Sequence, residues 1–411
     1  MKGLLRHSDF LKLWAAQTSS QFGGQVAVLT VPLTAALILK ATPFEMGVLT
    51  AAGTAPHVLL SLFAGAWADR RNRRSILISA DVGRAMLMLV IPLAFFLHAL
   101  GIGLMILVAS LTGALTVLFD IAHQSYLPSL VGREHLTDGN AKLLATQSAA
   151  LLIGPGIAGA LVGLISAPGA LVITSMTFVA SAAFLAWIRT RELASLSATV
   201  QPMLKQIRAG LCLVIMNPLL RAVAGYQATS NLFMQMVIAI LVLYCIRTLS
   251  ISPWLLGLMF SGSSIGFLLG ALSARRISHV AGPGPCIVWG ATVMCLGCLA
   301  IPFASGAPLH AALIVGAGLA LSGFGETIFL ANQMSLRQAI TPDRLQGRMN
   351  ATMRFLTWSF RPIGAVLGGV IGDAFGLWAA LIIGTGGMLL ALPWIYASPL
   401  LAAHKMPPLV E

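Results

Sequence analysis

Residues 46–74 read MGVLTAAGTAPHVLLSLFAGAWADRRNRR. The part from 46 to 68 is a nearly uncharged, apolar run, long enough for one membrane-spanning helix of roughly 20 residues. The run ends abruptly in one acid and four arginines: Asp69, Arg70, Arg71, Arg73 and Arg74. Clustered positive charge directly after an apolar run is typical of the cytoplasmic end of a membrane span. Arginines this dense also occur in nucleic-acid-binding patches, so composition has to decide between the two interpretations.

The composition of the chain favours a membrane protein. Of its 411 residues, 58% are hydrophobic and only 9% are charged. A soluble domain has about 45–50% apolar residues and about 25% charged residues. Little polar sequence is left for a soluble catalytic or DNA-binding domain, so we expect neither an enzyme nor a nucleic-acid partner. The five cysteines lie mostly in apolar runs without clustered histidines or acids, and we therefore expect no metal site and no cofactor.

Apolar runs of similar length recur along the whole chain. Their spacing predicts an all-α membrane protein of twelve spans, because backbone groups in lipid must be satisfied within each segment. The expected spans are 14–38, 46–68, 75–98, 102–122, 142–166, 169–188, 219–245, 254–274, 285–304, 308–330, 350–372 and 375–397.

The positive charges test this map. With the N-terminus in the cytoplasm, 20 of the 25 lysines and arginines fall on cytoplasmic segments, and only Lys40 and Arg247 fall on the opposite side. Because positive residues resist translocation, we expect a multi-pass protein with both termini cytoplasmic.

The chain also repeats itself. A polar segment, 189–216, divides it into two six-helix bundles, 1–188 and 217–411. Three amide side chains in the first span recur in the seventh at an offset of 210: Gln17, Gln21 and Gln25 match Gln227, Asn231 and Gln235. Parallel repeats of this kind are typical of transporters that bind their substrate between the two halves.

The arginine-rich end of the second span resembles a known motif. The segment GAWADRRNRR, residues 65–74, is similar to the loop between spans two and three of the major facilitator superfamily, with Asn72 in place of a glycine. The resemblance implies a gating latch in which Asp69 docks on the N-terminus of span eleven and Arg73 pairs with Asp120. The motif residues assigned to this latch also include Gly65, Arg70 and Arg74. The alternative is that the motif only sets topology.

Span five carries a second resemblance. Gly154, Pro155 and Gly159 look like the antiporter motif of drug-exporting members, although Ala150 and Ala158 replace two of its glycines. Small residues allow close helix packing, and proline bends a helix. The resemblance implies export, whereas the alternative is ordinary small-residue packing.

Two further stretches, 127–136 and 335–348, resemble the macrolide-efflux and enterobactin-exporter branch of the superfamily. This branch exports varied organic molecules and commonly uses the proton gradient. The resemblance therefore implies a small-molecule substrate and protons as partners.

The two amide stripes are candidates for the wall of a substrate cavity. Residues four apart share one helix face, so each stripe lines one side of its span. Amides offer donors and acceptors without a fixed charge, which suits neutral or weakly charged amphipathic molecules. Arg361, near the middle of span eleven, is a further cavity candidate. Hydrogen bonding between helices is the alternative role for the stripes.

Ionisable residues inside spans are costly and are therefore functional candidates. Glu326 in span ten is our first candidate for proton coupling, and His57 in span two is the second. A static ion pair between Glu326 and Arg354 is the alternative.

Together these features predict a bacterial inner-membrane exporter that exchanges small organic molecules for protons. Within the same fold, an importer, a proton symporter or a uniporter is the alternative, and a non-transporting receptor fits less well. We expect a monomer in the lipid bilayer.

Overall fold

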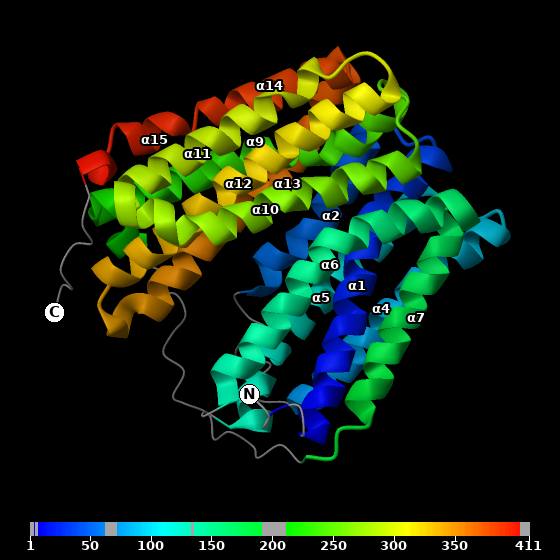
Figure 1. Cartoon of the computed structure of the whole chain (residues 1–411). Helices are drawn as coiled ribbons and strands as arrows, with labels where there is room; N and C mark the ends of the chain where they lie inside the picture. Colours follow the sequence, from blue (N-terminus) through cyan, green and yellow to red (C-terminus); the bar gives the residue numbers. More distant parts are fainter. Residues whose placement is uncertain (1–3, 5–6, 62–71, 133–134, 191–210, 403–411) are drawn as a thin grey trace. The chain divides into compact units, whose positions relative to one another are not determined.

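The computed structural model describes residues 4, 7–61, 72–132, 135–190 and 211–402 (Figure 1). These residues are almost entirely helical, and no strand occurs among them. The α-helices are α1 (Ser8–Leu37), α2 (Pro43–Ser61), α4 (Arg73–Phe96), α5 (Ile102–Val131), α6 (Leu136–Ile165), α7 (Ala167–Ala186), α9 (Pro218–Arg247), α10 (Pro253–Ala281), α11 (Pro283–Leu299), α12 (Pro308–Ile340), α13 (Asp343–Phe375), α14 (Leu377–Leu389) and α15 (Leu392–Tyr396). Each of the twelve expected spans has its helix, the last being formed by α14 and α15, so the all-α membrane fold is confirmed.

Ten of the described helices are long and apolar enough to cross a membrane by length and composition. Helices α1 and α2 are not among the ten. Helix α1 carries the polar stripe of glutamines, and the described part of α2 stops at Ser61.

The chain forms two compact units. The first contains 1–41 and 52–200, and the second contains 201–411 together with 42–51, the start of α2. The segment 42–51 packs tightly on α13: a Cβ atom at Gly47 would lie 2.6 Å from the carbonyl oxygen of Ala365. Glycine is therefore required at this helix crossing.

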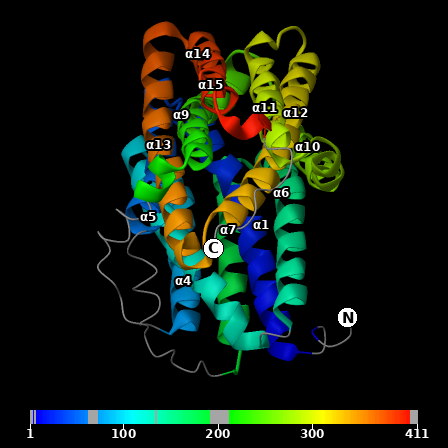
Figure 2. The same ribbon diagram turned by 90° about the vertical axis from the view of Figure 1, so that its left-hand side faces the viewer.

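In the first unit, α1 lies between α6 and α7, and α4 packs on α5 and α7 (Figure 2). The apolar core at one end of this unit includes Phe10, Leu77, Phe119 and Tyr126, all buried. The arrangement brings α1, α4 and α7 together, which positions the buried charges described below.

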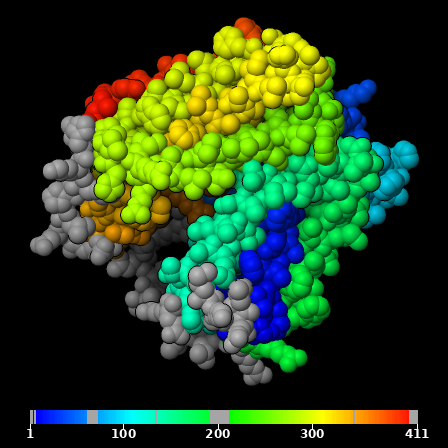
Figure 3. Space-filling model, viewed as in Figure 1, coloured from blue at the N-terminus to red at the C-terminus, as the bar shows by residue number. Residues whose placement is uncertain are grey.

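The second unit repeats this pattern. Helix α9 packs on α13 and α14, and α12 packs on α10 and α11. Glycines allow the close approach of α11 and α12, because a Cβ at Gly290 would lie 2.7 Å from the carbonyl oxygen of Gly325. Helix α10 lies on the face of the second unit seen in Figure 3. Its exposed apolar side chains include Ile265, Leu269 and Leu272. In a membrane protein this stripe faces lipid.

Several helices extend beyond the expected spans. Helices α5 and α12 continue to Val131 and Ile340, and α6 and α13 begin at Leu136 and Asp343. The stretches 127–136 and 335–348, which lie outside the expected spans, are therefore mostly helical where the structure describes them. Apolarity marks only the part of a helix that lies in lipid, so a span predicted from apolarity stops before its helix does.

Candidate functional site

A cavity of about 460 Å³ opens within the second unit. Its wall is formed by α9, α10, α11, α12 and α13. The lining includes five of the predicted site residues: Gln227, Asn231, Gln235, Glu326 and Arg361. The structure thus brings the amide stripe, the candidate proton carrier and the deep arginine to one place.

The stripe on α9 follows from the helical repeat. Asn217 caps the helix by accepting hydrogen bonds from the backbone of Leu219 and Leu220, and Pro218 occupies the first position. Nine and thirteen residues after Pro218, Gln227 and Asn231 line the cavity. The Nδ2 of Asn231 donates to the carbonyl of Gln227 at 2.8 Å.

Arg361 is held from two sides. Its Nε donates to Oδ1 of Asn231 at 2.8 Å, and its guanidinium carbon lies 4.3 Å from the ring centre of Trp358. A cation over the face of tryptophan is attracted by the electron-rich ring. These contacts fix the guanidinium in the wall of the cavity.

Glu326 lies on α12, partly buried. The positive charge of Arg361 acts on this carboxylate. Arg354, the partner considered from the sequence, instead lies 5.8 Å from the ring of Trp358. Among the residues described, no ion pair joins Glu326 to either arginine.

Sequence reasoning missed several lining residues. Arg337 donates to Oε1 of Gln333 at 3.2 Å and to Oδ1 of Asn350 at 2.5 Å. Tyr226 packs on Phe329 with ring centres 4.8 Å apart. Arg337 lies in a stretch outside the expected spans, where helical spacing was not considered. Counting i, i+4 positions past the apolar run would have placed it on the Gln333 face.

The other predicted cavity and proton residues belong to the first unit. Gln17, on α1, is 7% exposed, and no described residue donates to its Oε1. Gln21 and Gln25 follow on the same helix, both partly buried. His57 lies next to Pro56 on α2, in the first unit.

Charge in the first unit is buried in the helix core. Asp81 is fully buried and pairs with Arg84. Ser181 donates to Asp81 at 2.5 Å, and Ser20 lies 3.4 Å from the same carboxylate. The Arg84 guanidinium also lies over the rings of Phe119 and Phe178, at 4.4 and 4.6 Å.

Some of the predicted latch residues lie in the part of the chain that the structure describes, and others do not. Gly65, Asp69 and Arg70 lie outside the described residues. Arg73 donates to the carbonyl of Ser125 on α5 at 3.2 Å, five residues beyond Asp120.

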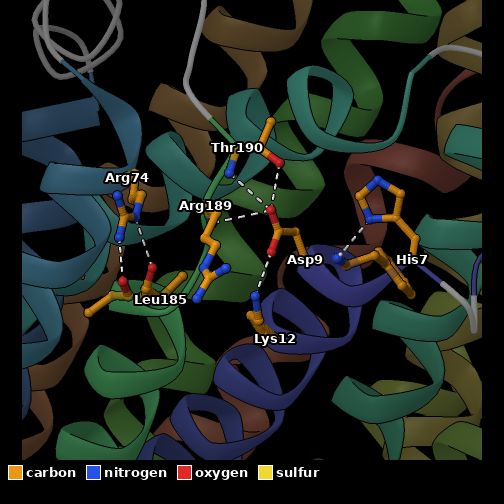
Figure 4. A network of polar contacts seen from close by, with 9 residues as sticks. His7, Asp9, Lys12, Arg74, Leu185, Arg189 and Thr190 are labelled. Carbon is orange, nitrogen blue, oxygen red and sulfur yellow. Dashed lines mark hydrogen bonds and ion pairs between the residues drawn. The ribbon is translucent and has the colours of Figure 1, made fainter.

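Arg74 donates to the last carbonyls of α7, those of Leu185 and Ala186 (Figure 4). A cation at a helix C-terminus satisfies free carbonyls and interacts favourably with the helix dipole. The second arginine pair of the motif thus contacts α5 and α7.

Asp9 fixes the chain just beyond α7. Its Oδ2 accepts from the backbone N–H groups of Arg189 and Thr190, and its Oδ1 accepts from Lys12 at 2.7 Å (Figure 4). Partial burial opposes the charged form, but hydrogen bonds from Lys12, Thr190 and Arg189 outweigh it and hold the pKa of Asp9 well below its usual range. The ionised carboxylate therefore stabilises the folded protein.

We expect Asp9→Asn to cost about 1–2 kcal/mol at neutral pH. A lowered folded-state pKa means that the stabilisation is complete above the unfolded pKa of about 4 and is lost as pH falls further. The difference in melting temperature between wild type and variant should therefore narrow below about pH 4. Asp138→Asn is the control, because Asp138 makes only a partly exposed helical pair with Lys142, worth about 0.3–0.5 kcal/mol. Equal effects of the two variants would contradict the assignment.

The antiporter-like segment lies within α6, with Pro155 inside the helix and Gly159 buried. Gly154 packs against α1: a Cβ there would lie 2.5 Å from the Cβ of Gln25. The glycine thus sets the distance between the two helices at the end of the glutamine stripe.

Gly154→Ala is expected to destabilise the protein by about 1–3 kcal/mol, since α1 or α6 must shift to admit the methyl group. Gly24→Ala is a matched control, because a Cβ at Gly24 meets no atom within 4 Å. Thermal melting of the purified protein in detergent measures both. A melting temperature of Gly154→Ala at or above that of Gly24→Ala would refute the crossing argument.

The fold and the cavity define a membrane transporter built on two helical repeats. The family model described as transmembrane secretion effector matches residues 3–407, so the chain belongs to this family of major facilitator transporters.

Curated relatives of the chain include efflux proteins. The multidrug efflux pump Tap of Mycolicibacterium fortuitum is 25% identical over 382 residues, covering 90% of this chain and 91% of its own length. The enterobactin exporter EntS of Escherichia coli is 29% identical over 268 residues, 64% of this chain and 58% of EntS.

Solved structures confirm the fold. The nucleoside transporter NupG superposes with a TM-score of 0.78 at 12% identity, covering 97% of this chain and all of NupG. An inward-facing bacterial homologue of the iron transporter ferroportin gives a TM-score of 0.75 at 19% identity, over 96% and 99% of the two chains. At such low identities the likeness concerns fold alone.

Proposed function

We propose that the protein exports small organic molecules from the bacterial cytoplasm across the inner membrane by alternating access. The observation that carries this is the cavity of about 460 Å³ in the second unit. Its wall combines apolar and aromatic side chains with convergent amide and charged groups, which can orient a small organic molecule. The efflux activity named for Tap and EntS supports the outward direction.

Protons are the proposed counter-ion, with Glu326 as their carrier. Its carboxylate faces the cavity, and Arg361 supplies the charge that acts on it. Protonation of Glu326 removes its attraction to Arg361, which Asn231 and Trp358 otherwise hold in the wall. A proton arriving from outside thus changes the site that a substrate occupied. His57, in the first unit, is the second candidate.

The remaining assignments are part of the same proposal. Asp69, Arg73 and Asp120 form a cytoplasmic latch, and Arg74 anchors it through the end of α7. The two amide stripes, one on α1 and one on α9, contact the substrate. The protein acts as a monomer. Both of its termini are cytoplasmic.

The test uses inside-out vesicles with an imposed acid interior that is reported by a pH-sensitive dye. Macrolides, lipophilic cations, catecholates and sugars are added in turn. A compound that makes the interior less acidic only in vesicles containing the protein supports proton antiport. Transport of labelled solute without any proton movement would refute coupling. Accumulation of the solute by intact cells would instead indicate an importer of the same fold.

A further inference from the structure

The charges on the cavity wall do not balance. Three arginines, Arg337, Arg354 and Arg361, face a single acid, Glu326. We propose that the cavity binds an amphoteric aromatic molecule, with a basic nitrogen on Glu326 and an acid group on Arg361 and Arg354. This inference rests on the proposed function, in which the cavity is the substrate site.

Glu326 is available for a ligand. No hydrogen bond joins its carboxylate to another residue in the part of the chain that the structure describes. Arg361 uses Nε for Asn231, and its two terminal nitrogens make no hydrogen bond with the described residues. Both charges face one cavity without pairing with each other. Charged groups that are removed from water require partners, and one ligand with both signs of charge supplies both.

The acid group of the ligand meets more than one cation. The guanidinium carbons of Arg361 and Arg354 lie 4.3 Å and 5.8 Å from the ring centre of Trp358. In the part of the chain that the structure describes, Arg337 is held by neutral groups, Gln333 and Asn350 among them, so its charge adds to the positive potential of the wall. Guanidinium groups bind carboxylates with paired, directional hydrogen bonds. The acid group should therefore contribute more to affinity than the amine.

The aromatic part of the proposed ligand follows from the aromatic side chains in the cavity wall. The rings of Tyr226 and Phe329 pack together, and Phe267 and Trp358 are the other aromatic residues of the lining. Aromatic rings attract one another in offset or edge-on geometries beyond their apolar burial.

Gln227 favours a ligand that carries a hydrogen-bond donor. It is more than nine-tenths buried, lines the cavity, and its Oε1 accepts no hydrogen bond from the described residues. An unsatisfied buried acceptor is costly, so a ligand N–H or O–H directed at it is favoured. The basic nitrogen or an amide of the ligand meets this demand.

Three dansyl compounds on one scaffold test the proposal. Dansyl-lysine, labelled on its side-chain nitrogen, carries an ammonium and a carboxylate. Dansylcadaverine carries only the ammonium, and dansyl-aminohexanoic acid carries only the carboxylate. Binding to purified protein in detergent is followed by the rise of dansyl fluorescence. We expect dansyl-lysine to bind about tenfold more tightly than the acid, and the acid more tightly than the amine.

Charge-removing variants assign each charged group of the probe to its partner in the cavity. Glu326→Gln should make dansyl-lysine bind no better than the acid, while Arg361→Gln should remove most of the advantage of both carboxylates over dansylcadaverine. Asp373→Asn and Arg276→Gln are controls, because both residues are exposed and neither lines the cavity. They should leave the order of the three probes unchanged.

Equal affinities for the three probes, or tightest binding of dansylcadaverine, would overturn the proposal. The proposal would also be overturned if the Glu326→Gln and Arg361→Gln variants fold and bind the three probes in the same order of affinity as wild type. The vesicle assay separates this outcome from failure of the proposed function. Probe binding with the expected order but without transport would refute export and leave the binding chemistry standing. Transport of other solutes by a protein without the probe order would refute only the amphoteric class.

Discussion

Replacing Arg84 with methionine is expected to destabilise the first unit by about 3–5 kcal/mol, because it leaves the carboxylate of Asp81 buried without its cation. Asp81 has no exposed surface, and its partners come from three helices: Arg84 on α4, Ser20 on α1 and Ser181 on α7. The substitution also removes the guanidinium from Phe119 and Phe178. A large fall in melting temperature and in the yield of monodisperse protein measures the effect.

A double variant separates the loss of the pair from the loss of packing. When Arg84→Met is combined with Asp81→Leu, no uncompensated charge remains, and we expect most of the lost stability to return. If the double variant does not recover the lost stability, the destabilisation by Arg84→Met comes from lost side-chain packing and not from the loss of the ion pair. A single Arg84→Met variant with the melting temperature of wild type would show that the pair does not support the fold.

Glu326→Gln is expected to reduce substrate-driven proton movement to the level of vesicles without the protein. Glutamine keeps the size of the side chain and can still hydrogen-bond, but it cannot carry a proton at ordinary pH. Exchange of labelled substrate down its own gradient should persist, because the cavity keeps its shape. Fluorescence of a trapped pH dye and uptake of labelled substrate, measured in one vesicle preparation, give both quantities.

Two variants make this result specific. Glu326→Asp keeps a titratable group and should retain part of the proton movement. Asp373→Asn removes an exposed acid from α13, outside the cavity, and should behave as wild type. Full proton movement in Glu326→Gln would exclude this residue as the carrier and direct attention to His57.

The span count and the amide stripe could be predicted from the sequence because both depend on local periodicity. Apolar runs mark helices that cross lipid, and a spacing of four places Gln227 and Asn231 on one face of α9. The ends of α12 and α13 could not be found in this way, since the helices continue where apolarity stops. This hid Arg337 and Asn350, which meet across the turn between the two helices.

Long-range partners could not be predicted. Asp81 is 61 residues from Ser20 and 100 residues from Ser181, and nothing in local spacing joins them. In the same way, the sequence suggested Arg354 as the partner of Glu326, and Arg361 only as a cavity residue. The choice depends on which face of α13 turns toward α12, and the structure places the acting charge at Arg361.

The two repeats place their charges differently, and this affects how the transporter can evolve. In the first repeat an ion pair is buried among helices, so most single substitutions at Asp81 or Arg84 should destabilise the fold and be eliminated by selection. In the second repeat the charges border an open cavity, where a substitution alters what binds before it alters whether the chain folds. Selection for resistance to a new toxic compound should therefore recover mutations mainly on α9, α12 and α13, while the first repeat supplies the stability that tolerates them.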